Sequence, residues 1–532
     1  MSRRPVLLAV LSITACAAPA PLPPAPAPVA VAPTPPAATA EPVAAAPPPS
    51  AEPAPAAPAT TAEPAADPPA PPSSAKQRLY AQAYPTRIYG RPKVDERLIG
   101  LLRYGTSVTL KSTELVRGEG CRGGFYQIEP RGYVCNDRSV TLAPSQRFLD
   151  IAASLVASPG PLPYRYAFSD GAPMYNRVPS AAEQARAERG FGPTSDKRKL
   201  PKHRSSYEDL AFVEPIEPAD SMPPFLNGNG RLNDAHLGLV KEKIPPRSML
   251  AFSRAFAVDG RTFLLSSDHS LVPADRTRVF KPSTFHGTRL GGDVQLPLAW
   301  MRATPKAQHR RNAGGGFEKT AGTWPAKGFV RLTGNAVEDG RTKYLETMDH
   351  DDTGATLWIA EKDATVMEAA KRLANGVKQG QKWIVVSISQ GTLIAYEGLT
   401  PVYATLMSPG RGGIPIKGHD NVADSTTPLG TYNITFKDKV STMSPDKPGD
   451  ERTNWIADVP HTQYFDPPFA LHAAFWHDRF GEPTSAGCVN VSPIDAEALF
   501  KWTDPPVPEE WQGATGAGAP ENGPMTAIVI RK

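Results

Sequence analysis

The stretch EPTSAGCVNVSPIDAEALF, residues 482–500, places a single cysteine, Cys488, between a turn of small residues and the start of a helix. Ser492 is the expected N-cap of that helix, Pro493 takes its first position and Asp495 completes a capping box. The predicted apolar face of the helix consists of Ile494, Leu499 and Trp502. The question is why one cysteine stands at this junction.

The number and the expected pairing of the cysteines bear on this question. The chain has 532 residues and four cysteines. Cys121 and Cys135 flank a hairpin-like segment, CRGGFYQIEPRGYVC, and can bridge its two arms. In an oxidising compartment Cys488 is then the odd cysteine, and we expect it to stay unpaired for a functional reason. The local pattern alone leaves two interpretations open, a nucleophile and a small buried thiol.

The N-terminus, MSRRPVLLAVLSITACAAPAP, has the pattern of an export signal over residues 1–16. Two arginines precede an apolar run that is too short to span a bilayer. The run ends in Ile-Thr-Ala-Cys, which resembles a bacterial lipobox and predicts acylation of Cys16. The alternative is an ordinary secretory signal cleaved near Ala18 or Ala20. Either interpretation predicts an exported protein of the periplasm or cell envelope, and the first predicts a lipid anchor in a bacterial membrane.

Residues 17–75 are almost entirely Ala and Pro, and the chain as a whole has 60 prolines. Such a tract has too little apolar surface to pack, so we expect a disordered, extended tether that reaches on the order of 100 Å. The formal net charge of +5 is small for this length, and there is no nucleic-acid motif. Nucleic acid is therefore not an expected partner.

The remainder is predicted to be mainly β. Residues 76–145 show short strands and resemble a small SH3-like barrel, and residues 146–235 are expected to form an irregular connector with one short helix capped by Ser180 and Glu183. Residues 236–375 contain Asp-Gly-Arg-Thr twice, at 259–262 and 339–342. Because Asp-Gly favours tight hairpins, this repeat predicts tandem SH3-like β modules.

Each repeat is followed by an Asp-His pair, Asp268-His269 and Asp349-His350. Metal ligation is one interpretation of these pairs. Neighbouring residues on a strand point to opposite faces, so we favour a role in turns. No metal site is predicted.

Residues 376–532 form a different domain. QKWIVVSISQGTLIAYEG predicts two strands joined at a Gln-Gly turn, and PVYATLMSPGRGG, TPLGTYNITFK and TAIVI predict three more. A thiol in this domain needs a base to become a nucleophile. His472 ends an apolar strand sixteen residues before Cys488 and is the favoured base, whereas His477 lies in a loop that we expect to be exposed.

The turn before the cysteine adds further candidates. Gly487 lacks a Cβ and allows close backbone approach, which suits an oxyanion hole. Ser485 and Asn490 are short polar residues that can brace the turn or contact substrate.

These residues resemble the L,D-transpeptidase (YkuD-type) catalytic domain. The resemblance rests on the histidine of YFDPPFALH, the GCVNVS turn that follows it, and the upstream strand STTPLGTYNI. It covers residues 376–532 and implies a β-sandwich or barrel domain. Carried over, Cys488 is the nucleophile, His472 the base and Gly487 part of the oxyanion hole, and Ser485 and Asn490 match the motif's remaining positions.

Two positions depart from the family pattern. Ala486 stands where a histidine is usual, and Ala473 stands where glycine or serine often follows the base. The loop 410–425 is an insertion that can reshape the cleft. Four aromatic residues either line that cleft or belong to the core: Tyr464, Phe465, Phe475 and Trp476.

The resemblance implies peptidoglycan chemistry without a metal or organic cofactor. Cys488 would form a thioester with a stem tetrapeptide and pass the acyl group to an amine on a second stem peptide or an envelope lipoprotein. Water as acceptor would give a carboxypeptidase or hydrolase. A catalytically inactive, wall-binding envelope lipoprotein is the alternative from another class, supported by Ala486 and Ala473. A papain-like peptidase fits less well, because its cysteine precedes its histidine.

Overall fold

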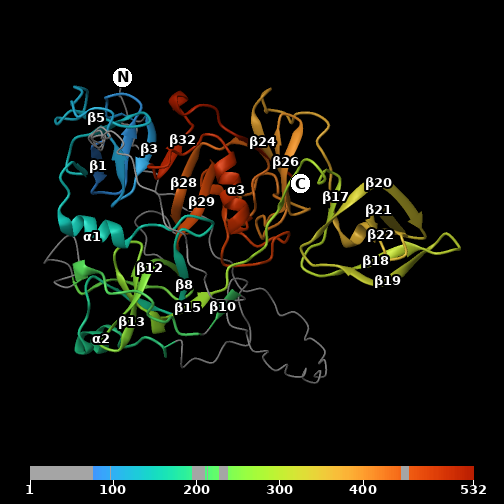
Figure 1. Cartoon of the computed structure of the whole chain (residues 1–532), viewed down its shortest axis with the longest axis horizontal. Helices are drawn as coiled ribbons and strands as arrows, with labels where there is room; N and C mark the ends of the chain where they lie inside the picture. The colour runs from blue at the N-terminus through green and yellow to red at the C-terminus, as the bar shows by residue number, and fades with distance from the viewer. Residues whose placement is uncertain (1–75, 96, 195–209, 213, 227–237, 445–454) are drawn as a thin grey trace, which may run out of the picture. The chain divides into compact units, whose positions relative to one another are not determined.

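The computed structural model describes residues 76–95, 97–194, 210–212, 214–226, 238–444 and 455–532. The predicted signal segment 1–16, the predicted lipidation site Cys16 and the predicted tether 17–75 lie outside the described residues. Strands dominate the described part, which confirms the mainly β prediction (Figure 1). Within these ranges no helix combines the length and apolar character needed to cross a bilayer.

Residues 76–145 form a small set of short antiparallel strands around a core that includes Leu79, Ile88 and Ile99. Strand β1 pairs with β4 and β7, β2 pairs with β3 and β6, and β5 pairs with β6. The SH3-like description of this module stays a prediction. Its strands are β1 (Arg78–Ala81), β2 (Thr86–Tyr89), β3 (Leu98–Leu102), β4 (Ser107–Thr109), β5 (Phe125–Gln127), β6 (Tyr133–Cys135) and β7 (Val140–Thr141).

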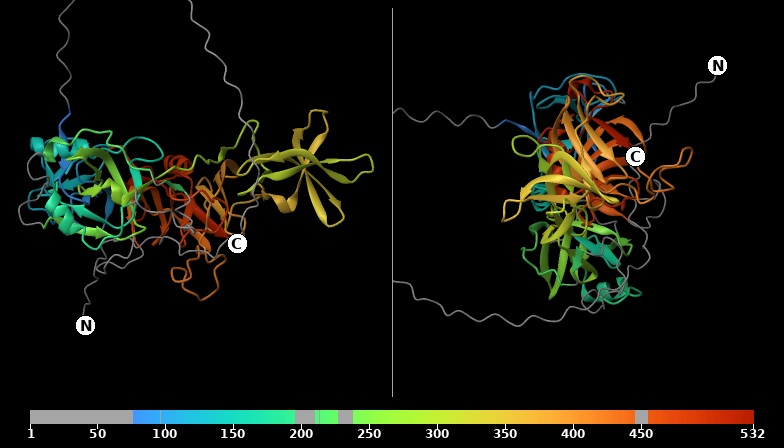
Figure 2. Two further views of the ribbon diagram at one scale, coloured as in Figure 1. Left: turned by 90° about the horizontal axis from the view of Figure 1, so that it is seen from below. Right: turned by 90° about the vertical axis from the view of Figure 1, so that its right-hand side faces the viewer.

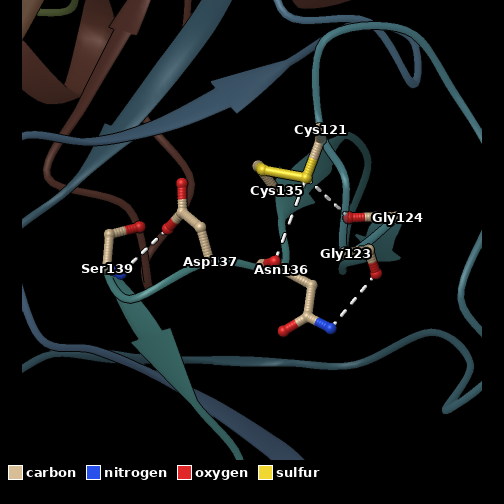
Figure 3. The surroundings of a disulfide bond; sticks show 7 residues. All are labelled: Cys121, Gly123, Gly124, Cys135, Asn136, Asp137 and Ser139. Carbon is tan, nitrogen blue, oxygen red and sulfur yellow. Dashed lines mark hydrogen bonds between the residues drawn. A yellow bond between two sulfur atoms is a disulfide. The ribbon is translucent and has the colours of Figure 1, made fainter.

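A disulfide joins Cys121 to Cys135 across the hairpin of this module (Figure 3). The Asn136 side chain donates to the Gly123 carbonyl at 3.2 Å, so the turn beside the disulfide is held by hydrogen bonds as well. The two cysteines lie in the arms that the sequence assigned to them.

Residues 146–280 differ from the predicted connector. Strand β8 (Arg165–Ser169) pairs with both β12 (Met249–Val258) and β15 (Thr277–Phe280), and β9 (Ala172–Tyr175) pairs with β11 (Val240–Ile244) and β14 (Leu271–Pro273). The connector therefore supplies strands to the sheet of the next segment, because its apolar run Tyr166–Phe168 is buried there. The remaining elements are α1 (Gln146–Ser154), α2 (Ala181–Ala187), β10 (Ala211–Phe212), η3 (Pro224–Leu226), β13 (Arg261–Ser266) and η4 (Ala274–Arg276).

The short helix predicted in this region is α2. The Ser180 hydroxyl accepts from the Glu183 amide, and the Glu183 carboxylate accepts in return from the Ser180 amide. This reciprocal pair is the capping box that the sequence indicated.

Residues 298–367 form a separate seven-stranded sheet in the order β19-β18-β22-β21-β20-β17-β23 (Figure 2, yellow). Its buried side chains include Trp324, Val330 and Ile359. The strands are β17 (Leu298–Trp300), β18 (Lys306–Arg311), β19 (Phe317–Trp324), β20 (Phe329–Asp339), β21 (Thr342–His350), β22 (Thr356–Ala360) and β23 (Thr365–Met367), and η5 (Glu361–Asp363) precedes β23.

The two Asp-Gly repeats fall in different sheets. Val258 pairs with Arg261 around the turn Asp259-Gly260, where both residues have positive φ. Asp339 pairs with Thr342 around the second turn. The repeat therefore marks two hairpins, and the first shares its sheet with β8 and β9 instead of with the second.

The Asp-His pairs follow those hairpins. His269 has positive φ in the turn after β13, and Asp268 forms an ion pair with Lys241. Asp349 and His350 end strand β21. Among the described residues no cluster of His, Cys, Asp and Glu has the arrangement of a metal site.

The C-terminal domain contains two sheets. The first has the order β16-β26-β25-β24-β33-β27, with the predicted Gln-Gly turn between β24 and β25 and the last strand parallel to β24. Its strands are β16 (Thr288–Arg289), β24 (Lys382–Ser387), β25 (Thr392–Glu397), β26 (Thr400–Leu406), β27 (Gly430–Asn433) and β33 (Ala527–Arg531).

The second sheet carries the segments around His472 and Cys488. Its strands are β28 (Phe436–Met443), β29 (Ile456–Asp466), β30 (Phe469–Ala473), β31 (Val489–Val491) and β32 (Gly513–Thr515), and η6 (Pro520–Asn522) follows them. Helix α3 (Pro493–Trp502) begins two residues after β31 and packs against β29 and β30 (Figure 1). Side chains of both sheets and α3 share one buried cluster, including Ile384, Leu471 and Leu499.

Helix α3 begins as the sequence predicts. The Ser492 hydroxyl accepts from the Asp495 amide, and Pro493 takes the first turn. Its buried face differs from the prediction and contains Ala496, Leu499 and Phe500, while Ile494 and Trp502 are only half-buried. The buried face differs from the predicted one because the Asp495 side chain is itself buried.

The first module is tied to the second sheet. Arg103 donates to both carboxylate oxygens of Asp458, at 3.0 and 2.7 Å, and the Tyr166 hydroxyl donates to the Asp458 carbonyl at 2.8 Å. Strand β3 also pairs with β32. The Asp458 side chain is 7% exposed and that of Arg103 20%, so the pair contributes mainly by compensating the buried Asp458 charge.

We expect Arg103→Gln to lower the free energy of unfolding by about 3–5 kcal/mol, because it leaves the Asp458 carboxylate buried without its cation. Denaturant unfolding of the full chain measures the change. The control is Arg91→Gln, which removes an exposed ion pair with Asp95 and should cost less than about 1 kcal/mol. Equal effects of the two substitutions would contradict the structural role given to the Arg103–Asp458 pair.

Candidate active site

Strands β30 and β31 lie side by side and parallel. The register pairs Leu471 with Val489, His472 with Asn490, and Ala473 with Val491. Side chains alternate along a strand, so the apolar residues of these pairs share one face, where they pack in the core with α3. His472 and Asn490 therefore occupy the opposite face.

Cys488 directly precedes β31 and belongs to that opposite face. It shares a buried cluster with Tyr464 and Ala470, and Tyr464 pairs with Ala470 across β29 and β30. Ala470 and His472 are two residues apart on β30, so alternation puts them on the same side. The sheet thus brings the Cys488 and His472 side chains onto one surface.

His472 is held as a neutral base. Its Nδ1 lies 3.0 Å from the carbonyl of Ala473, an acceptor, so Nδ1 carries the proton and Nε2 keeps its lone pair. Within the described part of the chain, Nε2 is buried and has no hydrogen-bond partner. Burial lowers the pKa of His472 to about 4, while the bond to Ala473 opposes that shift. The imidazole is therefore neutral at physiological pH.

The turn before the cysteine is organised by Ser485. Its hydroxyl donates to the Cys488 carbonyl at 2.6 Å and accepts from the Gly487 amide at 3.0 Å. The predicted bracing role of Ser485 thus has a geometric basis. The Gly487 amide is therefore already donating to Ser485. It can donate to a substrate oxygen only if this hydrogen bond breaks.

Gly487 occupies a conformation that other residues rarely adopt. Its φ is +128°, and a Cβ at this position would lie 2.5 Å from the Phe469 ring and 3.0 Å from the Thr426 carbonyl. Both the backbone angle and the space require glycine here.

The predicted insertion 410–425 begins and ends beside this turn. The amides of Thr484 and Ser485 donate to the Pro409 carbonyl at 3.0 Å, and the Arg411 amide donates to the Ser485 carbonyl at 2.8 Å. Ile416 and Val422, farther out in the insertion, are exposed. The insertion therefore holds the Cys488 turn from one side.

The redox state of Cys488 corrects one expectation. We expected an unpaired cysteine, whereas Cys488 is disulfide-bonded in the structure. The side chain is fully buried. Nucleophilic chemistry at this position applies to the reduced thiol.

His477 was expected to be exposed, and this expectation was wrong. Only 1% of His477 is accessible, and its Nε2 lies 3.3 Å from both Thr484 Oγ1 and Asn490 Nδ2. Its Nδ1 accepts from the Arg479 amide, so Nε2 carries the proton. Burial lowers the pKa of His477 to about 3.

The His477 ring joins two neighbours of the cysteine turn. Its Nε2–H can donate to Thr484 Oγ1, which lies 3.3 Å away. The Asn490 side-chain amide lies at the same distance from Nε2, and within the described part of the chain Asn490 Oδ1 is buried without a hydrogen-bond partner. His477 thus packs against Asn490 on the strand beside His472.

The predicted aromatic residues divide between the two faces. Tyr464 is buried beside Cys488, with its hydroxyl 2.9 Å from Ser441 Oγ. The Trp476 ring lies 5.8 Å from that of His472 and contacts Phe475, whereas Phe465 packs on the α3 side of the sheet. Tyr464 and Trp476 thus border the site, and Phe465 belongs to the core.

Sequence reasoning missed a buried carboxylate that fixes the start of α3. Asp495 Oδ1 accepts from the Gly287 amide and the Tyr403 hydroxyl, both at 2.7 Å, and Oδ2 accepts from Thr405 at 2.6 Å. Burial raises its pKa. The capping position of Asp495 was visible in the sequence, but its partners lie at least 90 residues away.

Comparison with known proteins assigns the C-terminal segment. Residues 381–517 match the family model described as YkuD: L,D-transpeptidase catalytic domain. No curated protein matches the chain.

Solved structures give similarities to three L,D-transpeptidases. One is from Xylanimonas cellulosilytica, with 20% identity over 31% of this chain and 64% of that one and a TM-score of 0.20. A mutant from Enterococcus faecium has 15% identity over 28% and 50%, with a TM-score of 0.20. A protein from Stackebrandtia nassauensis has 18% identity over 30% and 62%, with a TM-score of 0.19. The matched part of this chain covers less than two thirds of the length of each of these three proteins.

The family match extends from β24 to the turn after β32. It therefore contains the parallel strands of His472 and Asn490, the turn of Ser485 and Gly487, and Cys488. Residues 381–517 of this chain are an L,D-transpeptidase catalytic domain of the YkuD family.

Proposed function

We propose that the protein is a peptidoglycan L,D-transpeptidase in which Cys488, as a reduced thiol, is the nucleophile and His472 is the general base. The observation that carries this proposal is the neutral His472, whose Nε2 lone pair has no partner among the described residues and lies on the face of the sheet that also holds Cys488. A base with this tautomer accepts a thiol proton without rearranging its own hydrogen bonds.

The reaction proceeds in two acyl transfers. His472 Nε2 takes the Cys488 proton, and the sulfur attacks the carbonyl of the L-centre diamino acid in a stem tetrapeptide. The C–S bond forms, the C–N bond to the terminal D-alanine breaks, and the proton on His472 passes to the departing amine. An acceptor amine then attacks the thioester carbonyl, the C–S bond breaks, and the sulfur regains a proton.

The acceptor is an amine of a second stem peptide or of an envelope lipoprotein, and water in its place gives hydrolysis. Ser485 holds the cysteine turn through its hydrogen bonds to the Cys488 carbonyl and the Gly487 amide, and Asn490 contacts His477 beside it. We place the protein in the cell envelope, held by acylation of Cys16, because its substrate lies outside the cytoplasm. Mass spectrometry of the mature N-terminus tests that placement.

We expect Cys488→Ala to abolish turnover of muropeptide tetrapeptides by the reduced protein, because no other group replaces the sulfur. The matched control is Val489→Ala, whose side chain lies on the opposite, α3-facing side of the strand. It should lower stability and retain turnover. Turnover is measured by mass spectrometry of released D-alanine and muropeptide products. Persistent turnover in Cys488→Ala would refute the assigned nucleophile.

The acylation rate should decrease only at low pH. The base works only when neutral, a histidine is neutral above its pKa, and burial lowers the pKa of His472 to about 4. We therefore expect acylation to fall with decreasing pH only below about pH 5, and His472→Gln to reduce it by roughly 10²–10⁴-fold. Stopped-flow acylation by a carbapenem measures both. An inflection near 6.5 that survives in His472→Gln would count against this role.

Gly487→Ala should reduce acylation at least tenfold, because the added Cβ displaces the turn from Phe469 and Thr426. Gly481→Ala is the control: its φ is also positive, at +95°, but a Cβ there has no neighbour closer than 3.4 Å. Comparing acylation rates and thermal unfolding of the two variants separates backbone strain from loss of the site. Equal losses of rate would contradict the specific role of Gly487.

A further inference from the structure

A buried histidine that takes no part in the proposed reaction lies in the loop between β30 and the turn before Cys488. This loop, residues 474–481, contains His477, which is 1% exposed. The ring nitrogens of a buried histidine usually form hydrogen bonds, so their partners show what the ring holds in place.

His477 contacts the chain before and after Cys488. Its protonated Nε2 can donate to Thr484 Oγ1 at 3.3 Å, and Thr484 stands four residues before the cysteine. The side-chain amide of Asn490, two residues after the cysteine, lies at the same distance from Nε2. On the other side of the ring, Nδ1 accepts from the Arg479 amide of the same loop. The imidazole therefore spans the turn that carries Cys488.

Both neighbours of the His477 ring belong to segments of the candidate site. Thr484 directly precedes Ser485, whose hydroxyl holds the cysteine turn. Asn490 is the register partner of His472 across β30 and β31. The ring thus links the segment of the proposed nucleophile to the strand of the proposed base. Its loss would change the distance between these two groups without removing either.

The upstream seven-stranded sheet holds the same loop. Lys327, in the turn between β19 and β20, forms an ion pair with Asp478, the residue after His477. The Ser283 hydroxyl donates to the other oxygen of that carboxylate. The Lys327 backbone is fixed in turn, because its carbonyl accepts from Trp300 Nε1 at 2.8 Å. The loop is therefore anchored to residues outside the matched segment 381–517.

We propose that His477 is a positioning residue of the transpeptidase reaction and that Lys327 holds it through Asp478. His477 sets the spacing of Cys488 and His472 and takes no proton in the reaction. The upstream sheet then contributes to the chemistry through this loop. The effect on acylation rests on the proposed transpeptidase function, whereas the spacing of the thiol and the base can be tested without it.

The test compares His477→Phe, which keeps a ring and removes the donor, with His477→Gln, whose amide can still donate to Thr484. Stopped-flow acylation of the reduced full chain by a carbapenem gives the limiting rate and the half-saturating concentration separately. We expect His477→Phe to lower the limiting rate by roughly 10- to 100-fold, because a small misplacement of the reacting groups is costly. The half-saturating concentration should stay unchanged, and His477→Gln should recover most of the rate.

A double-mutant cycle with Thr484→Val tests the contact itself. If the hydrogen bond carries the effect, the double variant is no slower than His477→Phe alone. The control is His461→Phe, which replaces a histidine of β29 whose ring contacts Phe500. It should lower thermal stability and retain the limiting rate. Additive losses in the cycle, or an equal loss of rate in His461→Phe, would overturn the inference.

Lys327→Gln removes the cation that the upstream sheet supplies. The Lys327 side chain is 21% exposed and that of Asp478 39%, so we expect only a roughly two- to fivefold loss of the limiting rate. The matched control is Lys306→Gln, which breaks a similar pair with Asp363 within the upstream segment and should leave the rate unchanged. Equal rates of the Lys327→Gln and parent chains would overturn the role given to Lys327.

Alkylation of the reduced chain by iodoacetamide, followed by peptide mapping at Cys488, separates this inference from the proposed function. Alkylation needs no transpeptidase activity, and its rate at neutral pH rises with the thiolate fraction that the nearby base supports. If a carbapenem does not acylate the parent chain, the transpeptidase is refuted, and slower alkylation in His477→Phe than in His477→Gln still supports the positioning role. If acylation and alkylation are the same in the parent and His477→Phe, the positioning role is refuted and the transpeptidase stands.

Discussion

The parallel pairing of β30 with β31 is the constraint on which the site depends. It fixes His472 opposite Asn490 and puts Cys488 one residue before the strand, on the same face. Every apolar partner in the register faces α3 instead. A shift by one residue would exchange the two faces and turn the His472 imidazole toward α3, away from the face of Cys488.

Several buried polar groups hold this register. Asp495 joins the start of α3 to Gly287, Tyr403 and Thr405 of the first sheet. At the other end of α3, Lys437 donates to the carbonyls of Phe500 and Thr503, at 2.6 and 2.7 Å, where the helix dipole favours a cation. Burial lowers the pKa of Lys437 to about 7. The helix is thus fixed at both ends, and β31 is positioned directly before it.

Part of the fold and of the candidate site could be predicted from residues that are close in sequence. The cap at Ser492, the capping box at Ser180, the Gln-Gly hairpin and the histidine–cysteine order all depend on residues close in sequence. The features that the sequence did not predict depend on contacts between residues far apart in sequence. His477 is buried because Thr484 and Asn490 enclose it, and the run at 166–168 became a strand because β12 and β15 flank it. The family resemblance predicted Cys488 and His472 as the nucleophile and base but carried no information on the upstream segments or on Asp495.

The most direct measurement is the mass of the reduced full chain after incubation with a carbapenem, followed by peptide mapping of the adduct. We expect one covalent adduct per chain, on the peptide that contains Cys488. An unmodified Cys488, or an adduct confined to another residue, would contradict it.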